Sequence, residues 1–216
     1  MALRDRFPAW FDAARFRAAF VLEPAGLPLA ETRYSATPMS PNEGIGVDVQ
    51  LEYTDDRGDL RAEMWRRVEE IDGELVATHV VLSIIDMPPH PQGRFQGHGI
   101  ARRSMGRAIG LYDRLGVRRI VLAATDTGRL VWPKFGFRLA PDDREVFVVT
   151  VRAEHRRAFG SELALAIPES GHQLVELRRG KVPLGRAALK ARLYWTMTLD
   201  LTDSGSRTIL DEELRR

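Results

Sequence analysis

The chain has 216 residues, of which 44% are hydrophobic and 29% charged, and its formal net charge is +2. These values are typical of a globular protein with one substantial domain, and the near balance of charge argues against nucleic acid as the main ligand. The sequence contains no cysteine, which excludes disulfides, thiol catalysis, cysteine-ligated zinc sites and iron–sulfur clusters.

The remaining composition gives no sign of a metal site or a membrane segment. The five histidines lack metal-ligand spacing, and the longest apolar run, Val80 to Ile85, is far too short to cross a bilayer. Charged residues interrupt the N-terminal aromatics, so we expect no signal peptide and a cytoplasmic location. Only three of the 32 basic residues are lysines, a bias that suggests a GC-rich bacterial coding sequence.

The first 46 residues are predicted to form an extension that packs on the main domain. Residues 7–22 place Phe7, Trp10 and Phe11 at roughly helical spacing with later apolar residues, which favours one or two amphipathic helices. Residues 24–46 are rich in Pro, Gly, Ser and Asn with weak periodicity, which predicts an irregular connection.

Three strands are predicted next, as an antiparallel meander. Their ranges are Val47 to Tyr53, Leu60 to Ile71, and Leu75 to Ile85. A turn at residues 55–58 separates the first two, and Asp72-Gly73, a strong hairpin signal, separates the second and third.

A helix, a buried strand and a short helix follow a loop with three prolines at residues 86–95. The helix spans residues 99–115 and ends at Gly116, a suitable C-cap. The apolar segment Arg118 to Ala124 predicts a strand buried on both faces. Residues 127–134 favour a short helix that is broken near Pro133.

The last third of the chain is predicted to hold an insertion and a late strand, within a main domain of residues 47–216. The insertion covers about 153–191. In order, we expect a strand at Glu145 to Val151, a helix before Pro168, a strand around Leu174 to Leu177, a turn at residues 179–181, a helix near Leu184 to Ala191, an alternating strand at Arg192 to Leu201, and a terminal helix capped by Ser206.

The segment Gln96-Gly97-His98-Gly99-Ile100-Ala101 lies between a predicted strand and a predicted helix. A glycine-rich helix entrance presents unpaired N–H groups and the positive end of the helix dipole, an arrangement that suits a pyrophosphate. Gly97, Gly99 and the small Ala101 permit close approach. Arg102 and Arg103 follow, and one of them could reach a phosphate oxygen.

Other interpretations of these glycines fit less well or carry no chemistry. The Rossmann fingerprint needs a third glycine where Arg102 stands. No Gly-Lys-Ser/Thr sequence exists for a P-loop. A glycine-rich turn that merely starts a helix remains the alternative to a phosphate site.

The segment resembles the donor-binding signature of the GNAT superfamily of N-acetyltransferases, Gln/Arg-x-x-Gly-x-Gly/Ala. Gln96, Gly99 and Ala101 fill its fixed places. Residues 132–137, with the sequence WPKFGF, are similar to the family's short helix before a Gly-Phe pair. Residues 194–199, YWTMTL, are similar to its last strand. Order and spacing agree from about Val47 to Val151.

The resemblance implies an α+β fold with a mixed, mostly antiparallel sheet, flanked by helices and splayed at a parallel pair formed by the strands at 75–85 and 118–124. It implies acetyl-CoA or another acyl-CoA as donor, no metal, a monomer or homodimer, and an amine that attacks the thioester directly. The residues that it places around the donor are Ser83, Ile84, Ile85, Gln96, Gly97, His98, Gly99, Ile100, Ala101, Arg102, Thr125 and Trp132.

The catalytic groups depart from the family's pattern. Trp132 stands where the family commonly has a tyrosine that protonates the departing thiolate, and an indole cannot supply that proton. We hypothesise that His79 is the general base, because an imidazole titrates near neutrality. The alternative is a hydrogen-bonded histidine in or beside the sheet. Glu63 and Glu69 are rivals, each also interpretable as a solvated residue.

Three functions remain open. The first is transfer of an acetyl or related short acyl group to an amine of a small molecule or peptide. The second is transfer of a longer acyl group from acyl-CoA or an acyl carrier protein, for which the insertion leaves room. The third is a non-catalytic acyl-CoA-binding module, which Trp132 motivates.

Overall fold

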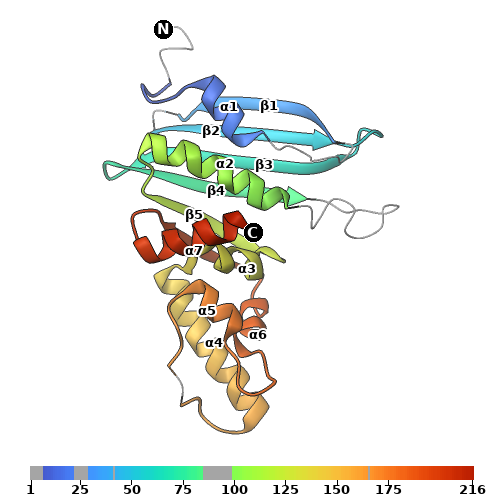
Figure 1. Ribbon diagram of the computed structural model, residues 1–216, viewed down its shortest axis with the longest axis vertical. Coiled ribbons are helices and arrows are strands. Elements are labelled where there is room, and N and C mark those ends of the chain that lie inside the picture. The colour runs from blue at the N-terminus through green and yellow to red at the C-terminus, as the bar shows by residue number, and fades with distance from the viewer. Residues whose placement is uncertain (1–6, 22–28, 41, 85–98, 165) are drawn as a thin grey trace. The chain divides into compact units, whose positions relative to one another are not determined.

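The computed structural model of the chain describes residues 7–21, 29–40, 42–84, 99–164 and 166–216. It contains two compact units, residues 1–118 and residues 119–216, and each is described by itself (Figure 1). The division of the chain at residue 46 stays a prediction.

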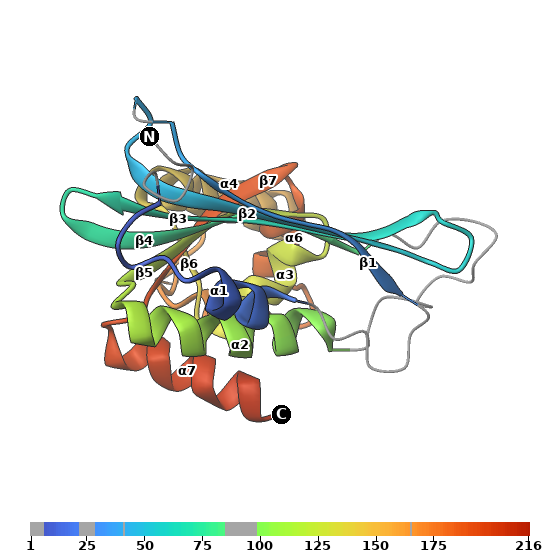
Figure 2. The ribbon, with the colours of Figure 1, turned by 90° about the horizontal axis from the view of Figure 1, so that it is seen from above.

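The described residues of the first unit form an antiparallel meander with two helices. Its strands are β1 (Ala30–Pro38), β2 (Ile45–Thr54), β3 (Leu60–Ile71) and β4 (Glu74–Ile84), and each pairs antiparallel with the next. Figures 1 and 2 show α1 (Ala13–Phe20) and α2 (Ile100–Leu115) on the same face of these strands. The predicted three-strand meander is therefore confirmed, with a fourth strand at its edge.

One face of the meander forms the core under the helices. Because successive side chains of a strand point to opposite faces, alternate residues of β2 and β3 share this face. Val49 and Leu51 of β2 and Met64 of β3 are at most 1% exposed. The hairpin between β3 and β4 turns at Asp72 and Gly73, which both have positive φ, as the sequence predicted.

Helix α2 covers this core and ends as predicted. Its buried residues include Met105, Ile109 and Tyr112, spaced by three and four positions so that they lie on one face. Gly116 follows the helix in the left-handed conformation, and its N–H reaches the carbonyls of the last turn.

The second unit combines three strands with six helical segments. Strand β7 (Tyr194–Asp200) pairs antiparallel with both β5 (Arg119–Thr125) and the short β6 (Arg138–Leu139). The helical segments are α3 (Gly128–Val131), the 3-10 helix η2 (Trp132–Phe135), α4 (Pro141–Phe159), α5 (Gly171–Glu176), α6 (Leu184–Lys190) and α7 (Ser204–Arg215).

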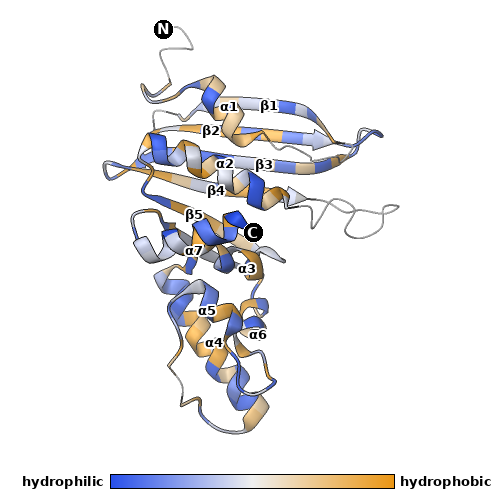
Figure 3. Ribbon diagram, in the orientation of Figure 1, coloured by the Kyte–Doolittle hydropathy of each residue, from blue (hydrophilic) through white to orange (hydrophobic). Residues whose placement is uncertain are grey.

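Two strands predicted in this unit are helices. The run Glu145 to Val151 is rich in β-branched residues, yet it lies inside the 19-residue helix α4. The reason is a buried stripe at intervals of four, made by Asp143, Phe147, Val151 and His155, which only a helix brings to one face. Figure 3 shows the resulting mixture of hydrophobic and hydrophilic bands along α4. The strand predicted at Leu174 to Leu177 is wrong in the same way, because α5 occupies it.

Other predictions in both units need smaller corrections. Residues 30–38 are a strand, not an irregular connection, and the alternation was absent because this edge strand has no fully buried residue. The N-terminal helix is confined to Ala13–Phe20. Strand β5 is not buried on both faces, since its buried residues alternate with exposed or half-buried ones. Asp203, not Ser206, caps α7, and it accepts the N–H of Ser206.

The α+β class with mostly antiparallel pairing is confirmed. At the end of the first unit, the N–H of Arg118 donates to the carbonyl of Leu75 on β4 at 2.9 Å. The helix predicted near Leu184 to Ala191 is confirmed as α6, the late strand as β7, and the turn at residues 179–181 by the bridge between Arg179 and Val182.

Candidate functional site

The N-terminus of α2 is one part of the predicted donor site that the structure describes. Gly99 is its N-cap, in the left-handed conformation with φ of 69°, and no side chain caps the helix. The first intrahelical bond runs from the N–H of Arg103 to the carbonyl of Gly99 at 3.0 Å. Helix geometry leaves the amides of the first turn without intrahelical acceptors, so they point out of the helix end. Glycine suits this position because side chains disfavour a positive φ.

A guanidinium lies beside this helix end. A Cβ on Gly99 would come within 3.3 Å of Nη1 of Arg103, so the Arg103 side chain folds back over the helix entrance. Its Nε and Nη2 are buried and have no hydrogen-bond partner among the described residues. The sequence placed Arg102 and Arg103 together at this position, and the geometry selects Arg103 as the one next to Gly99. Arg102 itself is half-buried.

Several predicted donor residues fall outside the described part of the chain. These are Ile85, Gln96, Gly97 and His98. Ile100 and Ala101, which are described, form the first turn of α2 with Ile100 buried. Their assignment to the donor stays a prediction.

Two further predicted donor residues lie at the end of β4. Ser83 is opposite Glu63 of β3, and Ile84 is opposite Ala62. Strand β4 and helix α2 both belong to the first unit, and residues 85–98 between them lie outside the described ranges. The structure brings the two ends of that segment into one unit without describing the segment itself.

His79, the hypothesised general base, lies in the interior under α2. It is 4% exposed, and its Nε2 is 2.8 Å from the hydroxyl of Tyr112. Burial lowers the pKa of His79 well below its usual 6.5, and the nearby Arg66 guanidinium lowers it further. Burial also raises the pKa of Tyr112, so the pair is an uncharged hydrogen bond near neutral pH.

The rival carboxylates lie on β3 in less buried surroundings. Glu63 is half-buried, and Glu69 is within 3.4 Å of the Thr78 hydroxyl. Neither the histidine nor the two glutamates is thereby assigned a catalytic role, and all three assignments stay predictions.

The second unit holds the two remaining predicted residues. Thr125 is the exposed last residue of β5 and pairs with Tyr194. Trp132 is 9% exposed at the junction of α3 and η2, where its ring packs 5.7 Å from that of Phe137. A Cβ on Gly128 would lie 3.0 Å from the indole nitrogen of Trp132, so a glycine at this position leaves room for the ring.

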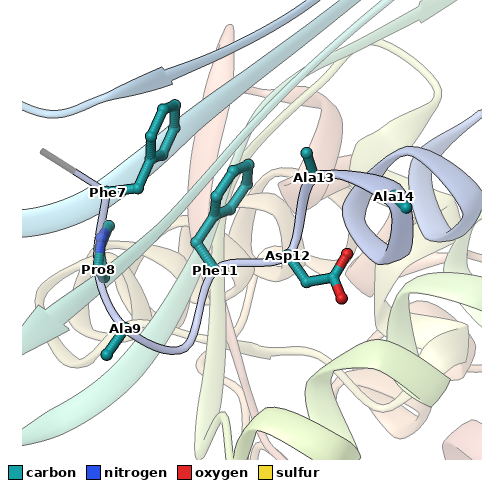
Figure 4. A pocket seen from close by; sticks show the side chains of 7 residues that line it. All are labelled: Phe7, Pro8, Ala9, Phe11, Asp12, Ala13 and Ala14. Atoms are coloured by element: carbon teal, nitrogen blue, oxygen red, sulfur yellow. The ribbon is translucent and has the colours of Figure 1, made fainter. Parts of the chain in front are cut away.

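A hollow near the N-terminus does not combine groups for chemistry (Figure 4). It is lined by residues 7–9 and 11–14, and the rings of Phe7 and Phe11 stack at 4.5 Å. Its only carboxylate, Asp12, caps α1 by accepting the N–H of Arg15 at 3.0 Å.

Within the described ranges, no three side chains are arranged to hold a metal ion. The helices of those ranges are also too short or too polar to traverse a lipid bilayer.

Comparison with known proteins gave no match among protein-family models and none among curated proteins. Among solved structures, a GNAT family acetyltransferase from Elizabethkingia anophelis with acetyl-CoA bound is similar at 11% identity, over 81% of this chain and 99% of that chain, with a TM-score of 0.36. Mutant forms of the spermidine/spermine N-acetyltransferase SpeG from Vibrio cholerae are similar at 15% identity, over 77% and 69%, with a TM-score of 0.33.

A third similar structure is a fungal multi-domain GH3 beta-N-acetylglucosaminidase with a GCN5-related glucosamine N-acetyltransferase region. The identity is 16%, the TM-score is 0.33, and the match covers 44% of this chain but spans only 12% of that protein. All three are acetyltransferases or contain an acetyltransferase region.

Proposed function

We propose that this chain is an acyl-CoA-dependent acyltransferase of the GNAT type. It transfers an acetyl or related short acyl group to an amine of a small molecule or peptide. The observation that carries the proposal is the open N-terminus of α2, which starts at Gly99 without a side-chain cap or an acidic residue in its first turn. Two arginines stand there instead, so the site is complementary to an anion.

The donor pyrophosphate occupies this helix end in the proposal. The amides of the first turn donate to its oxygens, and Arg103 adds a charge-assisted hydrogen bond from a guanidinium whose Nε and Nη2 lack partners in the described ranges. In the proposal the pantetheine arm extends along the end of β4 at Ser83 and Ile84 and toward Ile85, which lies outside the described residues. The assignment of Thr125 and Trp132, which belong to the second unit, to the donor stays a prediction.

The reaction is an attack of the neutral amine on the thioester carbonyl. A C–N bond forms, the C–S bond breaks, and the amine proton passes to a base or to water. Positioning of the two reactants is the main contribution of such a site. Because an indole cannot protonate the thiolate, solvent supplies that proton in the proposal, or CoA leaves as the thiolate.

His79 is the candidate general base, but its surroundings favour the alternative, a hydrogen-bonded histidine beside the sheet. A base must reach the proton that it removes. His79 is instead buried, neutral and bonded to Tyr112, which favours the role of a hydrogen-bonded histidine beside the sheet. A His79→Ala variant that keeps full turnover at saturating substrate would remove the catalytic assignment.

A non-catalytic acyl-CoA-binding module is the second candidate. Trp132 favours it, since a buried indole stands where a proton donor is expected. Binding of the donor without turnover is the property that separates this candidate from the enzyme.

Thiol release is the experiment that tests the enzyme, and this chain suits it because it contains no cysteine to react with a thiol reagent. Purified protein is mixed with acetyl-CoA and a panel of spermidine, spermine, glucosamine and short peptides. Amine-dependent release of CoA supports the proposal. Mass spectrometry of co-purified ligand distinguishes acetyl-CoA from a longer thioester. Tight CoA binding without release across the panel supports the module instead.

A further inference from the structure

Strands β3 and β4 change register in the middle of their ladder. Trp65 is opposite Val81, but the next residue of β3, Arg66, is opposite His79. Val80 is therefore an extra residue of β4, and the pair contains a β-bulge at this point. Such bulges bend a strand and change the direction of the side chains beyond them.

The bulge decides which residues of β4 face the helices. Residues opposite each other in a ladder share a face. Before the bulge, Ala77 and His79 lie opposite Val68 and Arg66, whereas after it Leu82 is opposite Met64. Odd-numbered residues face α2 before the bulge, and even-numbered ones face it afterwards. Without the bulge, Val81, Leu82 and Ser83 would point the other way.

Arg66 holds the strand at this position. Its Nη1 donates to the carbonyl of Val81 at 3.1 Å, immediately beyond the extra residue. The side chain is in the core, 1% exposed, and burial lowers its pKa to about 10. Within the described ranges Arg66 forms no ion pair, and its Nε has no hydrogen-bond partner. Burying a cation without a carboxylate is unfavourable, so this arginine is a poor choice for stability alone.

A second buried arginine of the same strand shows the contrast. Arg61 is 2% exposed, and it pairs with Asp55 at 2.8 Å and with Asp59 at 2.8 Å. These carboxylates belong to the turn between β2 and β3, which is remote from the bulge along β3. Arg61 thus belongs to a compensated structural ion pair, whereas Arg66 donates to a carbonyl of β4.

The same cluster also ties α2 to β4. His79, opposite Arg66, is 2.8 Å from the hydroxyl of Tyr112 on α2. Two elements therefore meet at the cluster of Arg66, His79 and Tyr112. One is the strand that ends at Ser83 and Ile84, and the other is the helix that begins at Gly99.

We propose that Arg66 is a positioning residue for donor binding: by holding the Val81 carbonyl at the bulge, it fixes the direction of the following segment, Leu82 to Ile84, on which the pantetheine arm lies. This inference rests on the proposed function, because that function places the arm on β4. Arg66 touches neither the donor nor the reacting atoms in this account.

The test compares matched substitutions of the two buried arginines. Arg66→Met removes the contact with Val81, and Arg66→Lys keeps a charge with a shorter reach. Arg61→Met and Arg61→Lys are the controls. For each full-length variant, amide exchange at residues 81–83 is measured by mass spectrometry, and the Kd of CoA by calorimetry, at a temperature where the protein is folded.

Arg66→Met should raise exchange at residues 81–83 about tenfold and weaken CoA about tenfold, and Arg66→Lys should recover part of both. Arg61→Met should lower the unfolding midpoint but leave both values unchanged. The milder lysine pair decides the outcome if a methionine variant does not fold.

Equal exchange at residues 81–83 in the Arg66 and Arg61 variants would overturn the proposal. So would faster exchange with an unchanged Kd for CoA. If the wild-type protein binds no CoA at all, the proposed function fails, and the exchange result alone then supports or overturns the role of Arg66 at the bulge.

Discussion

The N-termini of α2 and α4 are built in opposite ways. Neither helix has a side-chain cap. Helix α4 starts with a proline, which has no N–H to satisfy, and carries Asp142 and Asp143 in its first turn. Helix α2 starts at a glycine, has no acidic residue in its first turn, and has two arginines directly after Ala101.

The carboxylates of α4 are used inside the protein. Asp143 binds the guanidinium of Arg192 at 2.6 Å and accepts the N–H of Thr196 on β7 at 2.6 Å. This helix end thereby fixes β7. At α2 the arginines add positive charge to the positive end of the dipole, which is unfavourable by about 0.3–1 kcal/mol for each charge. The comparison teaches that α4 carries acidic residues at the positive end of its dipole, whereas α2 carries arginines there, which is the arrangement that the proposed anion site requires.

The sharpest way to break this contrast is to give α2 an acidic cap. Gly99→Asp should weaken CoA about a hundredfold, because a carboxylate near the phosphates repels them by roughly 2–3 kcal/mol. Calorimetric titration with CoA checks the change. Gly160→Asp is the matched control, since Gly160 follows α4 with φ of 66° and open space around it. An equal loss of affinity in both variants would contradict the account.

Removing the carboxylate of Asp143 in α4 should lower the free energy of unfolding and leave the affinity for CoA unchanged. Asp143→Ala leaves Arg192 and the N–H of Thr196 without their carboxylate, at a cost of about 2 kcal/mol. Urea unfolding measures the loss, and CoA affinity at a temperature where the variant is folded should equal that of the wild type. Asp142→Ala, at an exposed neighbouring position, is the control and should change little. Weaker CoA binding by folded Asp143→Ala would contradict the distinction between the N-termini of α4 and α2.

Arg103→Ala should weaken CoA about tenfold, as expected for loss of one charge-assisted hydrogen bond. The affinity should also become less sensitive to salt than that of the wild type. Arg114→Ala removes a cation from the other end of the same helix, where it is exposed, and should leave the Kd of CoA unchanged. If both arginines matter equally, the effect is one of overall charge, and the specific role of Arg103 is wrong.

The buried histidine of the first unit predicts a pH effect of smaller size. The pKa of His79 is depressed in the folded state, so the folded protein resists the proton that the unfolded chain accepts below about 6.5. The contribution of neutral His79 to the free energy of unfolding is therefore complete above about pH 6.5. It is lost as the pH falls below that value, by at most about 1.4 kcal/mol for each pH unit. Urea unfolding of wild type and His79→Gln at about pH 7.5 and 5.5 isolates the contribution.

The difference in free energy of unfolding between the wild type and His79→Gln should be smaller at the lower pH. His155→Gln is the control in α4, where a buried histidine has a different partner, because its Nδ1 donates to the carbonyl of Ser161 at 2.9 Å. A pH dependence that His79→Gln leaves intact would contradict the assignment.

Local signals explain which parts of the fold were predictable. Alternating apolar residues predicted β2, β3 and β7, and the glycine at 116 predicted the end of α2. The segment at 145–151 was mistaken because its β-branched residues outweighed a stripe at intervals of four that extends beyond it to Asp143 and His155. Strand β1 was missed because an exposed edge strand needs no apolar alternation.

The candidate site was predicted in part for the same physical reason. The two glycines before an apolar helix indicated the proposed anion site, because residue type restricts the conformations that the backbone can adopt. The contacts of Arg103 with the helix entrance and of Arg66 with Val81 depend on side-chain direction and on a register shift. No sequence pattern predicts either contact. The sequence therefore could not distinguish Arg102 from Arg103 as the phosphate ligand, and it gave no reason to single out Arg66.

Calorimetric titration with three related ligands tests the central claim most directly. CoA and 3′-dephospho-CoA both keep the pyrophosphate, and pantetheine lacks it. If the N-terminus of α2 binds the pyrophosphate, the first two should bind with similar Kd, and pantetheine should bind at least about a hundredfold more weakly. No heat of association with CoA, or equal affinity for CoA and pantetheine, would contradict the claim.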